Sequence, residues 1–179
     1  MKNNLKLLVI SALFAALACA ATMSIRIPTP GTNGYIHPGD AIVILSGVFL
    51  GPVYGMLAGG IGSALADLIG GYFIYVPITF LIKGLIALFC GLLFSKMGKT
   101  TRSRYFCVGM GGVIDLVLVA GGYYFFEAIM YGPAGALGSV PSNMVQGAGG
   151  LVLALILYPL LSAVPDLRRL STRNRTVSN

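Results

Sequence analysis

The sequence contains very little charge. Asp, Glu, Lys and Arg make up only 9% of its 179 residues, whereas hydrophobic residues make up 56%. Soluble domains carry roughly 25% charged residues, so a chain of this composition cannot cover a water-exposed surface, and we predict an integral membrane protein. Because one crossing takes about 20 apolar residues, the length allows one bundle of at most about six or seven helices. We therefore expect a single membrane domain over residues 1–179.

Residues for catalysis and metal binding are also scarce. The chain has one His and three Cys, and it contains no H-E-x-x-H motif and no glycine-rich phosphate loop followed by Lys. All three cysteines lie in or beside apolar runs without metal-ligand spacing, which is typical of small buried hydrophobic residues. We therefore expect no enzyme activity, no ATP hydrolysis by this chain, no metal and no cofactor.

The positive charge is concentrated in short clusters. The net charge is +7, but no aromatic residues interleave with the basic ones, so we expect no binding to nucleic acid. Each cluster abuts an apolar segment, as the positive-inside rule predicts for cytoplasmic loops. The clusters are Lys2 and Lys6; Lys96, Lys99, Arg102 and Arg104; and Arg168, Arg169, Arg173 and Arg175.

The apolar segments predict an all-α polytopic membrane protein. If the N-terminus lies in the cytoplasm, six transmembrane helices place every dense Lys/Arg cluster there, together with both termini and a tail at 165–179. The loops 26–40, 71–76 and 128–141 then lie outside, and their only basic residue is Arg26. The predicted helices cover residues 5–25, 41–51, 53–70, 77–95, 105–127 and 142–164.

Two of these segments allow further readings. Residues 5–25 also fit a secretory signal peptide, because basic residues precede an apolar run that ends in small residues. Segment 41–51 is short and ends at Gly51-Pro52, so we expect a kinked or partial crossing, with Asp40 as its N-cap. Three prolines and three glycines in 26–40 exclude a helix there.

Small residues recur at helical spacing in two places. Gly47, Gly51, Gly55 and Gly59 follow one another every four residues, and Ala12, Ala16 and Ala20 form a similar row in the first helix. Such rows let helix backbones approach closely in lipid. Packing within the bundle explains both rows at least as well as contact with a partner protein does.

The few polar residues within apolar segments gather toward the predicted outer side. An ionisable side chain at bilayer depth costs about 2.5–3.5 kcal/mol on insertion scales, so each is a candidate functional residue. Three simpler explanations stay open: an Asp67–Lys83 ion pair, a solvated Glu127 and a loop hydrogen bond for His37. Asp115 lies nearer mid-depth without an obvious partner. The candidates for substrate binding are His37, Asp40, Asp67, Lys83, Glu127, Asn143 and Gln146, with Tyr72, Tyr75 and Tyr124 as nearby aromatic rings.

A set of short motifs resembles a known family. The motifs are His37-Pro-Gly-Asp40, Gly51-Pro52-x-x-Gly55, Gly62-Ser-x-x-Ala66-Asp67, Gly71-Tyr72, Pro77-x-Thr79-x-x-x-Lys83-Gly84 and Pro141-x-Asn143-x-x-Gln146. Over roughly residues 5–164 the chain resembles the substrate-binding (S) components of energy-coupling factor (ECF) vitamin transporters. It is most similar to the branch assigned to pyridoxine and hydroxymethylpyrimidine.

The resemblance implies a vitamin pocket on the extracellular side of a prokaryotic plasma membrane. It also implies docking onto a transmembrane coupling subunit, EcfT, driven by two ECF ATPase subunits, with Ala12 and Ala16 on the contact face. We hypothesise that the ligand is a neutral hydroxylated aromatic heterocycle, recognised by carboxylates, amides and tyrosine rings. The rival hypothesis is a self-sufficient channel or proton-coupled carrier that uses Asp67, Lys83, Asp115 and Glu127 as a relay.

Overall fold

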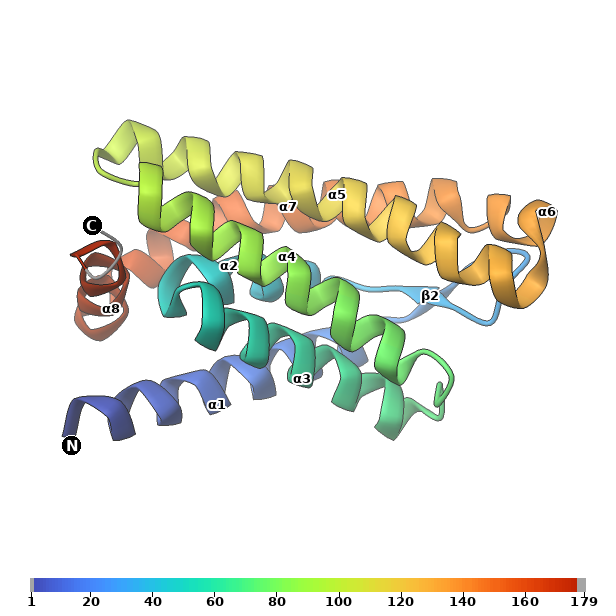
Figure 1. Cartoon of the computed structure of the whole chain (residues 1–179), viewed down its shortest axis with the longest axis horizontal. Coiled ribbons are helices and arrows are strands. Elements are labelled where there is room, and N and C mark those ends of the chain that lie inside the picture. The colour runs from blue at the N-terminus through green and yellow to red at the C-terminus, as the bar shows by residue number, and fades with distance from the viewer. Residues whose placement is uncertain (1, 177–179) are drawn as a thin grey trace.

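The computed structural model describes residues 2–176, which fold into a helical bundle with one small β-hairpin (Figure 1). The hairpin and α6 lie at one end of the bundle, called here the hairpin end. The N-terminus of α1, the α4–α5 loop and α8 lie at the other, called the terminal end. The elements are α1 (Lys2–Ser24), β1 (Ile27–Pro28), β2 (Tyr35–Ile36), α2 (Asp40–Leu50), α3 (Pro52–Gly70), α4 (Val76–Met97), α5 (Thr101–Tyr131), α6 (Pro133–Leu137), α7 (Val140–Ser162) and α8 (Pro165–Thr176).

The long helices have the length and composition of membrane spans. Among the described residues, five helical stretches are long and apolar enough to cross a bilayer: α1, α3, α4, α5 and the α6–α7 stretch. The predicted all-α membrane class is therefore confirmed. The remaining predicted segment, 41–51, corresponds to α2, which has only 11 residues. It therefore rises about 16 Å, roughly half of a hydrocarbon core.

The short helix α2 forms the centre of the bundle. Ten of its residues are buried, and it packs against α1, α3, α4 and α7. A helix that is apolar on every side is stable only when it is surrounded by other elements. It ends at Gly51, whose φ of 82° turns the chain into α3. This agrees with the expected partial crossing.

The glycine row serves packing within the bundle. A Cβ on Gly47 would overlap the Ala87 carbonyl of α4, and a Cβ on Gly55 would lie 2.6 Å from the Gly47 Cα. The close approach of α2, α3 and α4 therefore requires glycine at these positions. Of the two readings left open, the internal one holds for this row.

The small residues of helix α1 lie on two different faces of the helix. Ala15 and Ala18 face Gly62 of α3, where an added Cβ would lie 2.9 Å from the Ala18 Cβ. On the opposite face Ala12, Ala16 and Ala20 are exposed. The alanine row therefore plays no part in packing within the bundle.

A hairpin and two helices lie where only loops and a tail are predicted. The loop 26–40 is non-helical, as expected, but it pairs Ile27 with Ile36 in a two-stranded antiparallel hairpin. The short helix α6 follows α5, and the predicted tail contains α8. Helix α8 crosses the terminal end of the bundle (Figure 1) and buries Leu167 and Leu170. Its Asp166 accepts a hydrogen bond from Lys6 of α1 at 2.5 Å.

Candidate functional site

A small polar cavity lies beneath the hairpin. Its volume is about 20 Å³, close to the space needed by a single water molecule. The hairpin, the helices α3, α4, α5 and α7, and the adjoining residues His37 and Tyr75 enclose it. The cavity therefore exists only because these parts pack together. The lining residues are Thr29, Gly34, Tyr35, His37, Asp67, Tyr75, Thr79, Tyr123, Glu127 and Asn143.

Tyr35 of the hairpin closes one side of this cavity. Its hydroxyl donates a hydrogen bond of 2.7 Å to the Asp67 carboxylate of α3. Its ring lies 4.6 Å from the Tyr72 ring and 5.5 Å from the His37 ring. Burial and the neighbouring Asp67 carboxylate raise the pKa of Tyr35, so the phenol stays protonated and remains a donor. The hairpin is thus hydrogen-bonded to the bundle through a group that lines the cavity.

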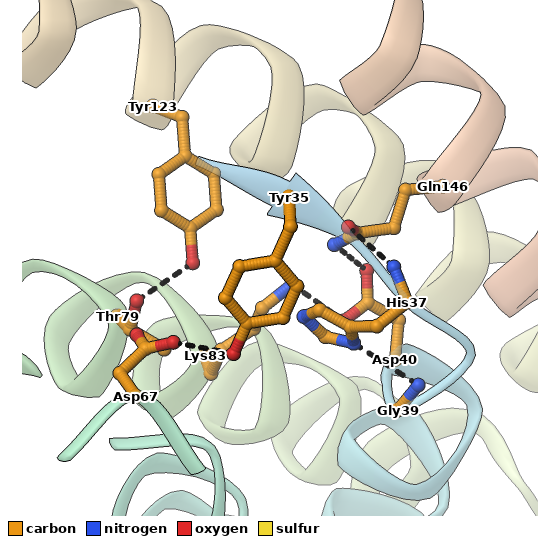
Figure 2. Close-up of polar contacts among 9 residues, drawn as sticks. All are labelled: Tyr35, His37, Gly39, Asp40, Asp67, Thr79, Lys83, Tyr123 and Gln146. Atoms are coloured by element: carbon orange, nitrogen blue, oxygen red, sulfur yellow. Dashed lines mark hydrogen bonds and ion pairs between the residues drawn. The ribbon is translucent and has the colours of Figure 1, made fainter. Parts of the chain in front are cut away.

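A second tyrosine–carboxylate contact also lines the cavity. The Tyr75 hydroxyl, next to the start of α4, donates to Glu127 of α5 at 3.0 Å, and the Ser139 hydroxyl donates to the other Glu127 oxygen. Burial raises the pKa of Tyr75, so it too remains a donor. One turn before Glu127, the Tyr123 hydroxyl shares a 2.9 Å hydrogen bond with Thr79 (Figure 2). The cavity lining therefore contains two carboxylates, Asp67 of α3 and Glu127 of α5, together with the rings of three tyrosines.

Below the cavity lies a buried ion pair. The Lys83 ammonium of α4 donates to Asp40 of α2 at 2.5 Å, and both side chains are completely buried. The other Asp40 oxygen accepts from Gln146 of α7 at 2.8 Å (Figure 2). Of the explanations left open above, the Asp67–Lys83 ion pair does not form, because Lys83 pairs with Asp40 and Asp67 accepts a hydrogen bond from Tyr35. The N-cap of α2 is Gly39, so the predicted capping role of Asp40 is also wrong.

His37 connects the hairpin to this ion pair. Its backbone N–H donates to the side-chain amide oxygen (Oε1) of Gln146 at 3.1 Å, and its Nδ1 accepts from the Gly39 N–H at 3.1 Å. Burial lowers the pKa of His37 to about 4, so the imidazole is neutral at physiological pH. His37 thus makes the expected loop hydrogen bond while its side chain also lines the cavity.

Asp115 of α5 lies next to the ion pair. It is fully buried, and neither of its oxygens has a hydrogen-bond partner. A Cβ added to Gly150 of α7 would lie 3.1 Å from an Asp115 oxygen and 2.8 Å from the Asp40 Cβ. Glycine at position 150 therefore leaves room for two carboxyl groups side by side.

The predicted site residues separate into three groups. Lining the cavity are His37, Asp67, Tyr75, Glu127 and Asn143; below it are Asp40, Lys83 and Gln146. Tyr72 lines a depression of about 490 Å³ on the surface of the hairpin end, which shares Gly34 and Tyr75 with the cavity lining.

The remaining predicted residue, Tyr124, does not line the cavity. Its neighbour Tyr123 does so, because Tyr123 lies one turn from Glu127 on the inward face of α5. Counting four residues back from Glu127 would have identified it. The sequence prediction also missed Thr29, Tyr35 and Thr79, and for Tyr35 the signal was absent because the hairpin itself was not predicted.

The bundle of apolar helices and its enclosed polar cavity define a multi-pass membrane protein. A family model described as "ECF-type riboflavin transporter, S component" matches residues 2–163. The chain belongs to this family of S components of ECF transporters.

Individual relatives are similar over most of their length. The chain is 38% identical over 132 residues to an uncharacterised protein of Pyrococcus woesei, covering 74% of this chain and 85% of the relative. It is 30% identical over 160 residues to the thiamine precursor transporter HmpT of Lactococcus lactis, covering 89% of each. It is also 28% identical over 164 residues to a UPF0397 protein of Streptococcus agalactiae, covering 86% and 90% respectively.

Proposed function

We propose that this protein captures a small vitamin or vitamin precursor in the cavity beneath the hairpin. The protein crosses a prokaryotic plasma membrane six times, with α2 and α3 as the second and third passes. The terminal end faces the cytoplasm, because the Lys and Arg clusters of the N-terminus, the α4–α5 loop and α8 lie there, and the hairpin end faces outward. The observation that carries the proposal is the enclosed cavity whose walls hold Asp67, Glu127 and several tyrosines.

The chemistry of the walls favours a neutral ring with hydrogen-bond donors. The Asp67 and Glu127 carboxylates accept hydrogen bonds, so they suit hydroxyl and amino groups at two edges of a ligand. Tyr35, Tyr75 and Tyr123 offer ring faces for stacking on an aromatic heterocycle. A hydroxymethylpyrimidine or a pyridoxine, each a single substituted ring, fits this pattern. The relationship to a thiamine precursor transporter supports the pyrimidine over the larger riboflavin.

Ligand entry requires movement of the hairpin. A cavity of about 20 Å³ is far smaller than the roughly 300 Å³ or more of ordinary ligand pockets. The depression that contains Tyr72 adjoins the cavity through Gly34 and Tyr75, which makes it the entrance. Opening the Tyr35–Asp67 contact joins the two spaces.

Direct binding measurements test the proposed ligand. Calorimetric titration of the purified protein with hydroxymethylpyrimidine, pyridoxine, thiamine and riboflavin should give a Kd below about 1 μM, or about −8 kcal/mol, for one of the single-ring compounds. Asp67→Asn should weaken that binding by about tenfold or more, because a buried charge-assisted acceptor is lost. The matched control Asp166→Asn, an acid at the terminal end, should bind normally. Absence of submicromolar binding for all four compounds would contradict the proposal.

The exposed alanine face of α1 is the proposed docking surface for the transporter's other subunits. Ala12 and Ala16 are exposed on the side of α1 that faces away from α3, so another membrane helix can approach their backbone closely. EcfT would contact this face, and two ATPase subunits would supply the energy. Ala16→Leu should abolish copurification with EcfT and the ATPases while vitamin binding persists. Val117→Leu, an enlargement on exposed α5, should leave copurification intact.

A further inference from the structure

A second cavity lies on the outside of the bundle, between α4 and α5. It is a groove of about 570 Å³ whose lining is apolar except for one residue, Lys96. Phe89, Leu92, Val113 and Val117 line it and are exposed. Because these helices have the character of membrane spans, the groove opens toward lipid. Its walls suit a hydrocarbon chain.

The groove has a defined depth and a charged end. Lys96 lies in the last turn of α4, at the terminal end, and Phe89 lies two turns further into the bundle. On α5, positions 102, 106, 110, 113 and 117 recur at helical spacing, so Arg102 lies on the same face as Val113 and Val117. The groove therefore runs from the exposed Lys96 toward mid-membrane. Arg102, also exposed, lies beyond the lining residues on the same face of α5.

The neighbouring charges favour an anion at that end. The protein has five acidic residues: four are buried, and Asp166 is paired with Lys6. Across the described chain, no surface carboxylate is left to neutralise Lys96 or Arg102. An anionic headgroup close to these side chains is attracted by both.

We infer that this groove binds one anionic phospholipid, with an acyl chain between α4 and α5 and its headgroup at Lys96 and Arg102. The site is independent of the proposed docking surface, because α1 packs on α2 and α3 and lies on the opposite side of the bundle in Figure 1. Assigning it to the cytoplasmic leaflet rests on the orientation proposed above. The recognition of an anionic lipid does not depend on that orientation.

The absence of tryptophan makes the site directly measurable. Phe89→Trp places the only indole in the groove, and its fluorescence reports contact with brominated lipid. Val53→Trp is the matched control: Val53 is exposed and its neighbour Pro52 contacts Gly91 of α4, so it lies at nearly the same depth. Both variants are reconstituted in phosphatidylcholine vesicles that contain equal mole fractions of brominated phosphatidylglycerol or brominated phosphatidylcholine.

Phosphatidylglycerol should quench Phe89→Trp several-fold more effectively than phosphatidylcholine, with no such preference at Val53→Trp. Adding Lys96→Gln and Arg102→Gln to Phe89→Trp should remove the preference for phosphatidylglycerol. Each basic side chain should account for up to about a fivefold preference. If both tryptophans showed the same preference for phosphatidylglycerol, the quenching would come only from ordinary surrounding lipid, and the inference would be overturned. Absence of quenching at Phe89→Trp would overturn it too, as would a preference that survives both charge substitutions. Unchanged melting temperatures confirm that the variants are folded.

Discussion

The two ends of the bundle are built from different chemistry. Toward the hairpin end, carboxylates, tyrosines and an ion pair are buried, and all of the carboxylates except Asp115 are hydrogen-bonded. Toward the terminal end, rings pack together: Phe49 and Phe94 lie 5.8 Å and 6.2 Å from the Tyr158 ring. Burying polar groups is costly unless each is paired, whereas ring packing stabilises directly. The difference indicates that ring packing holds the helices together in the terminal half, whereas the hairpin half contains the proposed binding site.

Removing the cation of the buried ion pair in the hairpin half should have the largest effect on the stability of the protein. Lys83→Met leaves the Asp40 carboxylate buried without a counter-ion and close to Asp115. Breaking one partner of a buried pair costs about 3–5 kcal/mol, so we expect a large fall in the melting temperature in detergent. Circular dichroism during heating measures it.

The controls separate charge from side-chain size. Lys96→Met changes an exposed lysine on the same helix and should leave the melting temperature unchanged. Asp40→Asn added to Lys83→Met should recover part of the lost stability, because the uncompensated charge is gone. If Lys83→Met melts like the wild type, the ion pair has no role in holding α2 and α4 together.

Acid should destabilise the hairpin half through His37. The folded protein keeps this side chain neutral down to a pKa of about 4, whereas the unfolded chain takes up a proton near pH 6.5. Between these values the unfolded state binds more protons, so stability is complete above pH 6.5 and falls as the pH drops toward 4, by at most about 3 kcal/mol. Melting curves from pH 7.5 to pH 5 should show this loss, and His37→Gln should reduce it. An equally steep loss in His37→Gln would assign the acid sensitivity elsewhere.

Removing one hydroxyl from each half should affect ligand binding unequally. Tyr35→Phe deletes the donor to Asp67 that closes the hairpin, so bound ligand should leave faster and affinity should fall about 5–30-fold, or about 1–2 kcal/mol. Tyr54→Phe removes a hydroxyl from a partly exposed tyrosine of α3 and should bind as the wild type does. Stopped-flow release of the ligand distinguishes them. Equal release rates would contradict closure by Tyr35.

The smallest effect is expected at the Lys6–Asp166 contact of the terminal end. Both side chains are nearly half exposed, and solvent-exposed pairs contribute little because water and salt screen them. The hydrogen bond from Lys6 lowers the pKa of Asp166, yet Asp166→Asn should leave the melting temperature within experimental error. A clear drop would show that α8 is anchored mainly by this contact.

The helices and the location of the polar residues could be predicted because they depend on local composition. Apolar runs located the long helices, and the scarcity of buried charge singled out Asp67, Lys83 and Glu127. The partners could not be predicted, because Lys83 and Asp40 are 43 positions apart and meet only when α2 and α4 pack. Tyr123 was missed for a related reason, since the inward face of α5 is set by its neighbours. Tyr35 depends on a hairpin of two-residue strands, which is too short to leave a periodic pattern.

Uptake in proteoliposomes tests most directly whether this protein captures a ligand or transports it unaided. Labelled single-ring vitamin is offered to vesicles that contain either the protein alone or the protein with EcfT, two ATPase subunits and ATP. Capture for separate machinery predicts stoichiometric binding without accumulation for the protein alone, and accumulation only in the complete, ATP-supplied vesicles. Accumulation by the protein alone, driven by a proton gradient and lost in Asp115→Asn, would contradict this and establish a self-sufficient carrier.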